Sequence, residues 1–191
     1  MVKKILVLNG NPKTQSFCKS LAEAYERGAK KSGAEVRRID VGDLNFDPVL
    51  WEAYDKIQRL EKDLIEVQQD IKWADHIVII YPIWWGDMPA ILKGLMDRIL
   101  LPGFSYKFRG PCKWDKLLKG RSAHIIEVIG GFSFVYRYWG APARNSMKKA
   151  ILGFSGIKPI RVTIISRLKF FKQKNFDRWI NKVERMGKRL R

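Results

Sequence analysis

Short runs of branched apolar residues alternate with segments of helical periodicity along most of this chain. The clearest run, "DHIVIIYP" at 75–82, has four consecutive branched apolar residues, which is typical of a strand buried on both faces. Further strands are predicted at 3–10, 34–40, 121–131 and 157–166. Amphipathic segments predicted as helices lie at 16–33, 51–74, 89–103, 140–156 and 175–191. Short strands joined through helices require right-handed crossovers and a parallel sheet covered by helices on both faces.

This alternation predicts an α/β fold of the flavodoxin-like type, with three layers and a doubly wound five-stranded parallel sheet in the order 2-1-3-4-5. The length of 191 residues suits a single domain, residues 1–191, with a sizeable core. We found no internal repeat and no interdomain linker. The segment 41–50 is predicted as a loop, and the segment 104–120 as an irregular basic connection.

Positive charge is the unusual feature of the composition. The chain has 37 Lys and Arg against 19 Asp and Glu, a formal net charge of +18. The excess is concentrated from Lys158 to Arg191, where twelve basic residues face two acidic ones. Such a tail attracts polyanions such as phosphate-bearing cofactors, nucleic acid or an anionic membrane surface. A solvated basic helix face is the plainer interpretation, and the absence of a nucleic-acid-binding motif argues against nucleic acid.

Cysteine and histidine are too sparse for a metal centre or a disulfide framework. Cys18 and Cys112 are far apart in the sequence, and His76 and His124 are the two histidines. No apolar run reaches the roughly 18 residues of a membrane helix. We therefore expect no metal and a reducing, cytoplasmic location.

In an open parallel sheet, ligands bind beyond the carboxyl ends of strands where the strand order reverses. The loops predicted to meet there are 9–16, 81–88 and 130–140. The first of them ends at a predicted helix start and offers backbone amides suited to an anion. Its polar side chains include Asn11, Thr14 and Ser16. A polar strand-to-helix turn without a ligand is the alternative, and the helix start could either activate Cys18 or simply bury it.

The other two loops are rich in aromatic residues and glycine. Trp84 and Trp85 suit the wall of a flat aromatic cofactor, although both could instead lie in the core or at a dimer interface. Gly130-Gly131 ends a predicted strand, where glycine lets a ligand approach the backbone closely. Phe132 and the other aromatic residues after it could face a ring. Tyr136 or Tyr138 could donate a proton, with packing under the loop as the alternative.

Four stretches of the sequence resemble the flavodoxin-like NAD(P)H:quinone oxidoreductase family, in order and at suitable spacing. They are "ILVLNGNPKTQSF", "WADHIVIIYPIWWGDMPAILKGLMDRIL", "GFSY" and "VIGG". The resemblance implies a flavin in the three loops, NAD(P)H as co-substrate, a quinone or similar acceptor, and a homodimer with the active site at the subunit interface. FMN is favoured over the alternative, FAD, because no adenine-binding segment is recognisable.

The resemblance also implies roles for individual residues, by position. Ser16, Phe17 and Cys18 match the end of the phosphate loop; Pro82, Ile83, Trp84 and Trp85 match the segment that holds the isoalloxazine ring; and Gly130 and Gly131 match its pyrimidine side. Tyr136 matches a tyrosine of the charge relay in the mammalian type. The relay histidine has no counterpart, since the matching region reads "YRYWGAPARN".

The sequence thus predicts a flavin-dependent NAD(P)H dehydrogenase of the quinone-reducing type. In this reading NAD(P)H gives a hydride to the flavin, and an acceptor then takes two electrons at the same place. The alternative is a regulatory or ancillary subunit of the same fold, which docks on a transporter or another partner through its basic surface.

Overall fold

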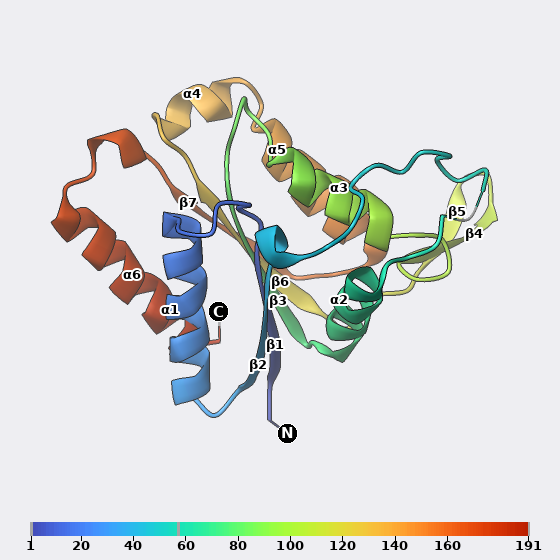
Figure 1. The fold of residues 1–191 in the computed structure, drawn as a ribbon, viewed down its shortest axis with the longest axis horizontal. Helices are drawn as coiled ribbons and strands as arrows, with labels where there is room; N and C mark the ends of the chain where they lie inside the picture. Colours follow the sequence, from blue (N-terminus) through green and yellow to red (C-terminus); the bar gives the residue numbers. More distant parts are fainter. Residues whose placement is uncertain (1, 57, 191) are drawn as a thin grey trace.

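Five parallel strands form the central sheet of the computed structural model, which describes residues 2–56 and 58–190. Their order across the sheet is β2-β1-β3-β6-β7 (Figure 1). The strands are β1 (Lys4–Asn9), β2 (Glu35–Asp40), β3 (His76–Pro82), β6 (Ser122–Val128) and β7 (Ile160–Ile165). Each neighbouring pair runs parallel. The predicted fold class and the order 2-1-3-4-5 are confirmed, with β6 and β7 as the fourth and fifth strands of this sheet.

Helices cover both faces of the sheet, as the buried strands require. On one face α1 and α6 lie side by side, and on the other lie α2, α3, α5 and the segment that continues α5 (Figure 1). The helices are α1 (Phe17–Lys31), α2 (Lys62–Trp73), α3 (Ala90–Ile99), α4 (Ser133–Tyr138), α5 (Pro142–Asn145) with its π-helical continuation η2 (Ser146–Gly153), and α6 (Gln173–Lys188). Two short 3-10 turns complete the chain, η1 (Val41–Asp43) and η3 (Leu168–Phe170).

The predicted start and stop of α1 are both present. Ser16 is the N-cap, and its Oγ accepts a hydrogen bond from the backbone N–H of Lys19 at 3.2 Å. Gly33 follows the last turn with φ +80°, a left-handed conformation that glycine adopts without steric cost. The N-terminus of α1 is therefore fixed directly after the loop that follows β1.

The prediction of a continuous helix over 51–74 is wrong for its first half, since α2 begins only at Lys62. Residues 51–56 form turns, although their charge pattern suits a helix. Arg98 on α3 explains the difference, because its buried guanidinium donates hydrogen bonds to the backbone carbonyls of Asp47 and Arg59 and to the Glu61 carboxylate. These tertiary bonds hold residues 44–56 and 58–61 against α3 outside any α-helix.

Two other segments differ from the sequence prediction. The stretch 104–120, predicted as irregular, contains an antiparallel hairpin of β4 (Tyr106–Gly110) and β5 (Lys113–Lys116), which projects at the edge of the molecule (Figure 1). The helix predicted over 140–156 begins at Pro142, and its central part is π-helical. The loop predicted at 130–140 contains the helix α4.

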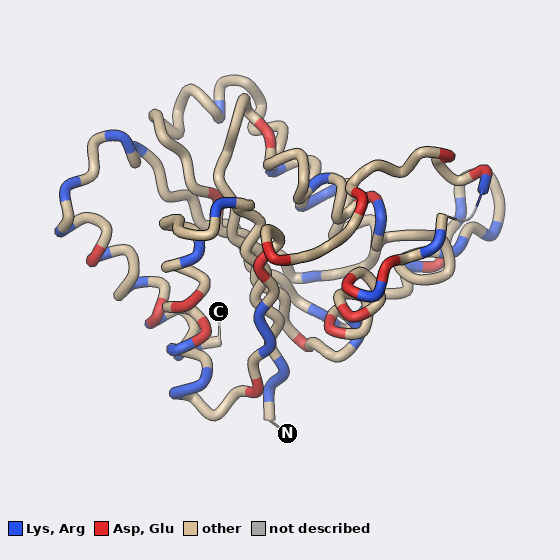
Figure 2. Tube along the Cα trace, viewed as in Figure 1, with Lys and Arg blue, Asp and Glu red and all other residues tan. Residues whose placement is uncertain are grey.

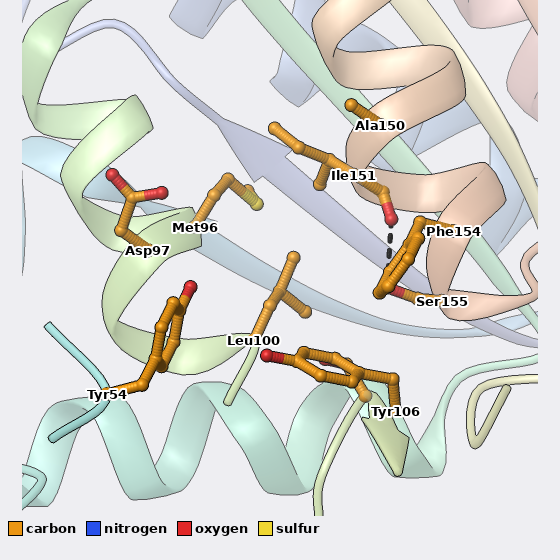
Figure 3. A pocket seen from close by; sticks show the side chains of 10 residues that line it. Tyr54, Met96, Asp97, Leu100, Tyr106, Ala150, Ile151, Phe154 and Ser155 are labelled. Carbon is orange, nitrogen blue, oxygen red and sulfur yellow. Dashed lines mark hydrogen bonds between the residues drawn. The ribbon is translucent and has the colours of Figure 1, made fainter. Parts of the chain in front are cut away.

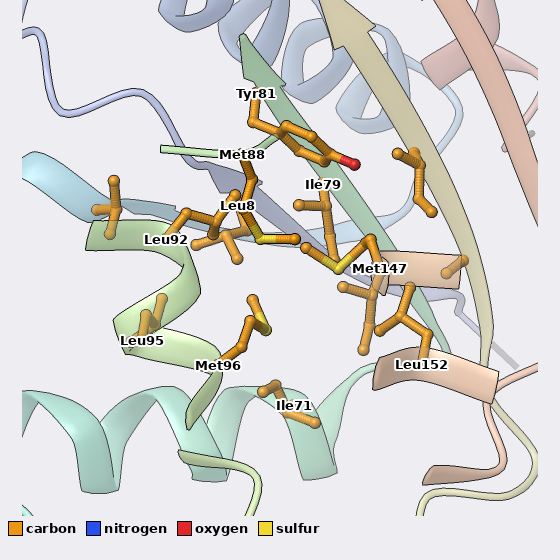
Figure 4. Close-up of a cluster of buried hydrophobic side chains, with 14 of the residues drawn as sticks. Leu8, Ile71, Ile79, Tyr81, Met88, Leu92, Leu95, Met96, Met147 and Leu152 are labelled. Atoms are coloured by element: carbon orange, nitrogen blue, oxygen red, sulfur yellow. The ribbon is translucent and has the colours of Figure 1, made fainter. Parts of the chain in front are cut away.

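A cluster of buried apolar side chains lies between the sheet and the helices α2 and α3 and reaches the carboxyl end of β3. Met88 points into it from the tryptophan loop and lies among Leu8, Ile79 and Leu92 (Figure 4). The loop 82–88 is thus anchored at its end by a buried side chain. Among the described residues, no helix is long and apolar enough to span a membrane.

Candidate flavin site

The loops predicted to hold a ligand follow β1, β3 and β6, which are adjacent strands whose carboxyl ends share one edge of the sheet. Gly10 N donates to Ile80 O of β3 at 2.8 Å, and two further hydrogen bonds tie the loop 81–88 to the end of β6 and to α5. Ile83 N donates to Val128 O at 2.8 Å, and Ala143 N donates to Gly86 O at 3.4 Å. Gly10 lies against Leu92 of α3, where an added Cβ would come within 2.5 Å of the leucine side chain. The structure therefore brings the three predicted loops together.

The loop after β1 is ordered by its own asparagine side chains. Asn9 Oδ1 accepts from Asn11 N at 3.2 Å, and Asn11 Oδ1 accepts from Lys13 N at 3.0 Å. The Asn9 amide also donates to Asp40 at 2.8 Å, which ties the loop to the end of β2. Asn11 is buried and turned into the loop, whereas Thr14 is exposed on it.

The N-terminus of α1 at the end of this loop has the properties of an anion site. The first turn contains no acidic residue, and Ser16 caps the amide of Lys19. In the described parts of the chain, the amides of Phe17 and Cys18 have no hydrogen-bond partner, as expected for the first turn of a helix. They could hold a phosphate together with the positive end of the helix dipole.

Cys18 can contribute only its backbone to such a site. Its side chain is buried against the sheet, and burial raises the pKa of the thiol to about 12. The alternative of a small buried residue is therefore the one that the structure supports. Phe17 is half-buried and packs edge-on against Phe171 and Phe176, so its ring anchors the start of α1 to the first turns of α6 and to the segment just before them.

The two tryptophans lie on a tight turn that closes a two-residue hairpin. Trp84 and Asp87 exchange two backbone hydrogen bonds of 2.8 and 3.0 Å, and Trp85 and Gly86 between them have φ of +51° and +81°. Positive φ at both central residues is the type I′ geometry, which tryptophan adopts less readily than glycine or asparagine. Trp84 is 47% exposed and Trp85 is fully exposed. Neither ring lies in the core, so both are available to a ligand or a partner.

The glycine pair after β6 presents backbone amides to the same edge. The carbonyl oxygens of Gly130 and Gly131 accept hydrogen bonds from Lys169 N and Arg167 N, at 3.1 and 2.7 Å. Among the described residues, the amides of Gly130, Gly131 and Phe132 have no hydrogen-bond partner. A Cβ added at Gly131 would meet no atom within 4 Å, so the space beside this backbone is open. The turn after β7 therefore holds the carbonyl groups of Gly130 and Gly131 in place, while the N–H groups of residues 130–132 remain available to a ligand.

The predicted proton donors lie in different environments. Tyr136 is buried, its hydroxyl accepts a hydrogen bond from Arg144 N at 3.0 Å, and it donates to Glu127 at 3.5 Å. Burial raises the pKa of Tyr136 to about 12, and the negative charge of Glu127 adds to this effect. Tyr138 is almost fully exposed on α4. The structure does not bring the two hydroxyls together.

A buried polar cluster beneath the loops escaped the sequence analysis. Glu127 is fully buried, and its carboxylate contacts the hydroxyls of Tyr81 and Tyr136 and the guanidinium of Arg144, at 3.4, 3.5 and 3.2 Å. Burial raises the pKa of Glu127, although Arg144 and the two hydroxyls oppose the shift. The sequence feature that could have revealed this cluster is Glu127, a single acidic residue inside the apolar strand "HIIEVIGG". This cluster ties α4, through Tyr136, and α5, through Arg144, to the end of β6.

A separate hollow lies at the far end of α3 from the tryptophan loop. It measures about 270 Å³ and is lined by Tyr54, Met96, Tyr106 and Phe154, among others (Figure 3). Ser155 Oγ, on its rim, donates to Ile151 O at 2.8 Å. None of the predicted site residues lines this hollow, so it is distinct from the candidate flavin site.

Comparison with known proteins agrees with the fold and with the sequence resemblance. Residues 3–190 match the family described as flavodoxin-like fold. An uncharacterized NAD(P)H oxidoreductase of Haemophilus influenzae is 29% identical over 163 residues, 81% of this chain and 79% of that protein. NAD(P)H dehydrogenase [quinone] 1 of Rattus norvegicus is also 29% identical, over 86% of this chain and 69% of that protein.

Solved structures share the same fold. The FMN-dependent NADH-azoreductase of Bacillus anthracis, solved in complex with FMN, superposes with a TM-score of 0.75. It is 23% identical, and the match covers 99% of each chain. The chain therefore belongs to the family of the flavodoxin-like fold, in which its relatives are named as NAD(P)H oxidoreductases and quinone dehydrogenases.

Proposed function

We propose that this chain is a flavin-dependent NAD(P)H oxidoreductase that passes two electrons to a quinone or a similar acceptor. The observation that carries the proposal is the set of three amides at Gly130, Gly131 and Phe132, which have no hydrogen-bond partner among the described residues and lie beside open space. The exposed tryptophans lie on the loop at the end of the neighbouring strand β3. The N-terminus of α1 lies on the same sheet edge and suits a phosphate. These features fit a flavin mononucleotide, and the relatives named as NAD(P)H oxidoreductase and quinone dehydrogenase support the same reaction.

FMN is the form of flavin that we propose, with FAD as the alternative. The amides of Phe17 and Cys18 would hold its phosphate, and the loop side chains of Asn11, Thr14 and Ser16 would line the way to it. Pro82, Ile83, Trp84 and Trp85 would flank the ring. The FMN-dependent neighbour from Bacillus anthracis supports this choice. A bound flavin supplies the capacity to accept a hydride from NAD(P)H and to return two electrons to an acceptor.

The protein's own contribution is orientation and charge stabilisation. Amide N–H groups aimed at one place stabilise negative charge there without reorganising, as an oxyanion hole does. The amides of Gly130, Gly131 and Phe132 would do so at the pyrimidine edge of the ring. Tyr136 would act as a positioning residue, because its buried hydroxyl is bound to Glu127 and Arg144 N. The exposed hydroxyl of Tyr138 is free to reach an acceptor and to donate a proton to it.

The purified protein is expected to take up flavin, to bleach with NAD(P)H and to recover its colour with a quinone. Gly131→Val is expected to weaken FMN binding roughly tenfold or more, because its side chain would fill the space beside the amides. Titration of FMN fluorescence gives this affinity, and mass spectrometry of the released flavin separates FMN from FAD. Circular dichroism and urea unfolding of Gly131→Val are expected to match the unaltered protein, so that a loss of FMN affinity can be assigned to the filled space. A protein that takes up no flavin would refute the proposal.

We also propose that the active protein is a homodimer. Trp85, Phe134, Tyr138 and Trp139 expose their rings on the predicted loops 81–88 and 130–140, and several large apolar side chains exposed near one site are typical of an interaction surface. Sedimentation equilibrium is expected to give twice the chain mass of 22.3 kDa. Replacing Phe134 and Trp139 with serine is expected to shift the protein towards the monomer. A monomer at micromolar concentration in the unaltered protein would contradict this expectation.

A further inference from the structure

A basic groove runs between α6 and the outer strands of the sheet, away from the candidate flavin site. It has a volume of about 780 Å³. Five cationic side chains line it: Arg161 from β7, Arg178, Lys182 and Arg185 from α6, and Arg189, the C-cap of α6. No Asp or Glu is among the described residues that line it. We call the space lined by these five residues the basic groove. Figure 2 shows the basic residues of α6, the helix at the left.

The groove follows from how α6 packs. The apolar side of α6, including Val183, packs on α1, so this helix does not cover the edge strand β7. The sheet face next to β7 therefore stays open, with Arg161 and Thr163 two residues apart and on the same side of the strand. On α6 the four cations are spaced by four, three and four residues, which places them on one face of the helix. Strand and helix thus point their cations into the same space.

The five cations of the groove have no ion-pair partner among the described residues, although the Lys182 ammonium lies 4.2 Å from the centroid of the Trp179 ring. Glu184 of α6 pairs with Arg27 and Lys31 of α1, at 3.6 and 2.6 Å, but no described residue forms an ion pair with any cation of the basic groove. All five side chains are exposed. Like charges three or four residues apart on a helix repel one another and destabilise it. A bound anion would remove this repulsion.

The buried histidine His76 on β3 lies within the electrostatic influence of Arg161 in the groove. The pKa of His76 is lowered to about 4, first by burial and then by the positive charges of Lys3, His124 and Arg161. His124 lines the groove itself, with Nε2 at 2.9 Å from Thr163 Oγ1. Arg161 on β7 therefore adds its positive charge to those of α6, whereas the lowered pKa keeps His76 neutral at pH 7.

We propose that the basic groove binds a linear chain of phosphates, of the kind found in inorganic polyphosphate. The row from Arg178 to Arg189 covers eleven residue steps of helix, about 16 Å, which is too long for a single phosphate and suits several in succession. Four of the five cations are arginine, whose planar fork binds phosphate oxygens in pairs.

Other polyanions fit the groove less well. Single-stranded nucleic acid binds through bases stacked on aromatic rings, and no Phe, Tyr or Trp is among the described residues that line the groove. A membrane surface is bound by a helix that exposes large apolar side chains beside its cations, whereas Met186 and Val162 are the apolar residues here and neither is fully exposed. A chain of phosphates needs only cations and a concave path, which the groove supplies.

The test is a titration of the full-length protein with short-chain inorganic polyphosphate at several salt concentrations. The groove variant combines Arg161→Gln, Arg178→Gln and Arg185→Gln. The control variant combines Lys107→Gln, Lys148→Gln and Lys149→Gln, which removes the same charge from exposed side chains that also have no described ion pair. The groove variant is expected to lose affinity roughly tenfold or more, with a slope of log K against log salt that is smaller by about two. The control variant is expected to stay close to the unaltered protein.

Several outcomes would overturn the proposal. Equal losses in the two variants would show that net charge alone attracts the polyanion. Orthophosphate that binds as tightly as polyphosphate would show a site for a single ion. Tighter binding of a single-stranded oligonucleotide with the same number of phosphates, or of anionic phospholipid vesicles, would identify a different ligand.

Two controls keep the test independent of folding and of the proposed flavin reaction. Circular dichroism checks that the variants fold, and the double variant Arg178→Gln, Arg185→Gln replaces the triple variant if that one does not. No residue of the basic groove belongs to the three loops of the candidate site, so flavin uptake and NAD(P)H oxidation are expected to be unchanged in the groove variant.

Discussion

Arg98→Met is expected to lower the free energy of unfolding by about 3 kcal/mol. The Arg98 side chain is fully buried, and its guanidinium donates to Glu61 Oε2 at 2.8 Å and to Arg59 O at 3.0 Å. It also donates to the carbonyl of Asp47. Methionine keeps much of the volume but removes these donors, so the residues around Asp47 and from Arg59 to Glu61 lose their attachment to α3. The loss is smaller than for a fully buried ion pair, because Glu61 remains 33% exposed and water can solvate it.

Urea unfolding of the two proteins measures this effect, and limited proteolysis locates it. Cleavage is expected first within 44–61, because that segment depends on Arg98. Lys93→Met is the matched control, since Lys93 lies on the same helix but pairs with Asp97 at the surface. Its expected effect is within about 0.5 kcal/mol. If both variants lost the same stability, the effect would come from α3 itself and not from the loop contacts.

Gly28→Ala is expected to lower the free energy of unfolding by about 2–3 kcal/mol, although alanine favours a helix more than glycine does. A Cβ at Gly28 would lie 1.9 Å from the backbone oxygen of Glu184 on α6. Gly187 makes the reciprocal contact, where a Cβ would lie 2.2 Å from the backbone oxygen of Tyr25 on α1. The two helices therefore touch backbone to backbone, and α6 would have to move away from α1.

Equilibrium unfolding in urea gives the size of this effect. Gly131→Ala is the control for exchanging glycine for alanine without a steric clash, because a Cβ at Gly131 would have no atom within 4 Å. Val183 and Trp179 pack in the same layer, so increased fluorescence quenching of tryptophan by acrylamide is expected if α6 is displaced. A variant as stable as the unaltered protein would show that α6 can shift without loss, with helix propensity compensating for the contact.

The sequence predicted the elements whose causes are local. "HIVIIYP" is buried at every position of β3, and a run of branched apolar residues can satisfy that environment only as a central strand. Ser16 and Gly33 marked the ends of α1 within one or two residues, because capping depends on side chains next to the helix end. The three candidate loops were located for the same reason, since parallel strands place their carboxyl ends on one edge of the sheet.

Other features depend on contacts between residues distant in sequence, and the local pattern does not report them. The segment 51–56 has a helical charge pattern, yet Arg98 holds its neighbours as a loop. The hairpin of β4 and β5 pairs two basic stretches that have weak strand signals of their own. Trp84 and Trp85 could not be assigned to core or ligand from the sequence, because only the turn geometry places both rings outside the core.

The sequence by itself determined the order of the strands, the faces of the helices and the residue types at the strand ends. The tertiary structure alone decided which amides remain free beside Gly131, which carboxylate lies beneath them at Glu127, and which cations meet along α6. The physical reason is the range of the interactions involved. Periodicity and capping act over a few residues, whereas hydrogen bonds, burial and electrostatic repulsion depend on distances in space that folding brings about.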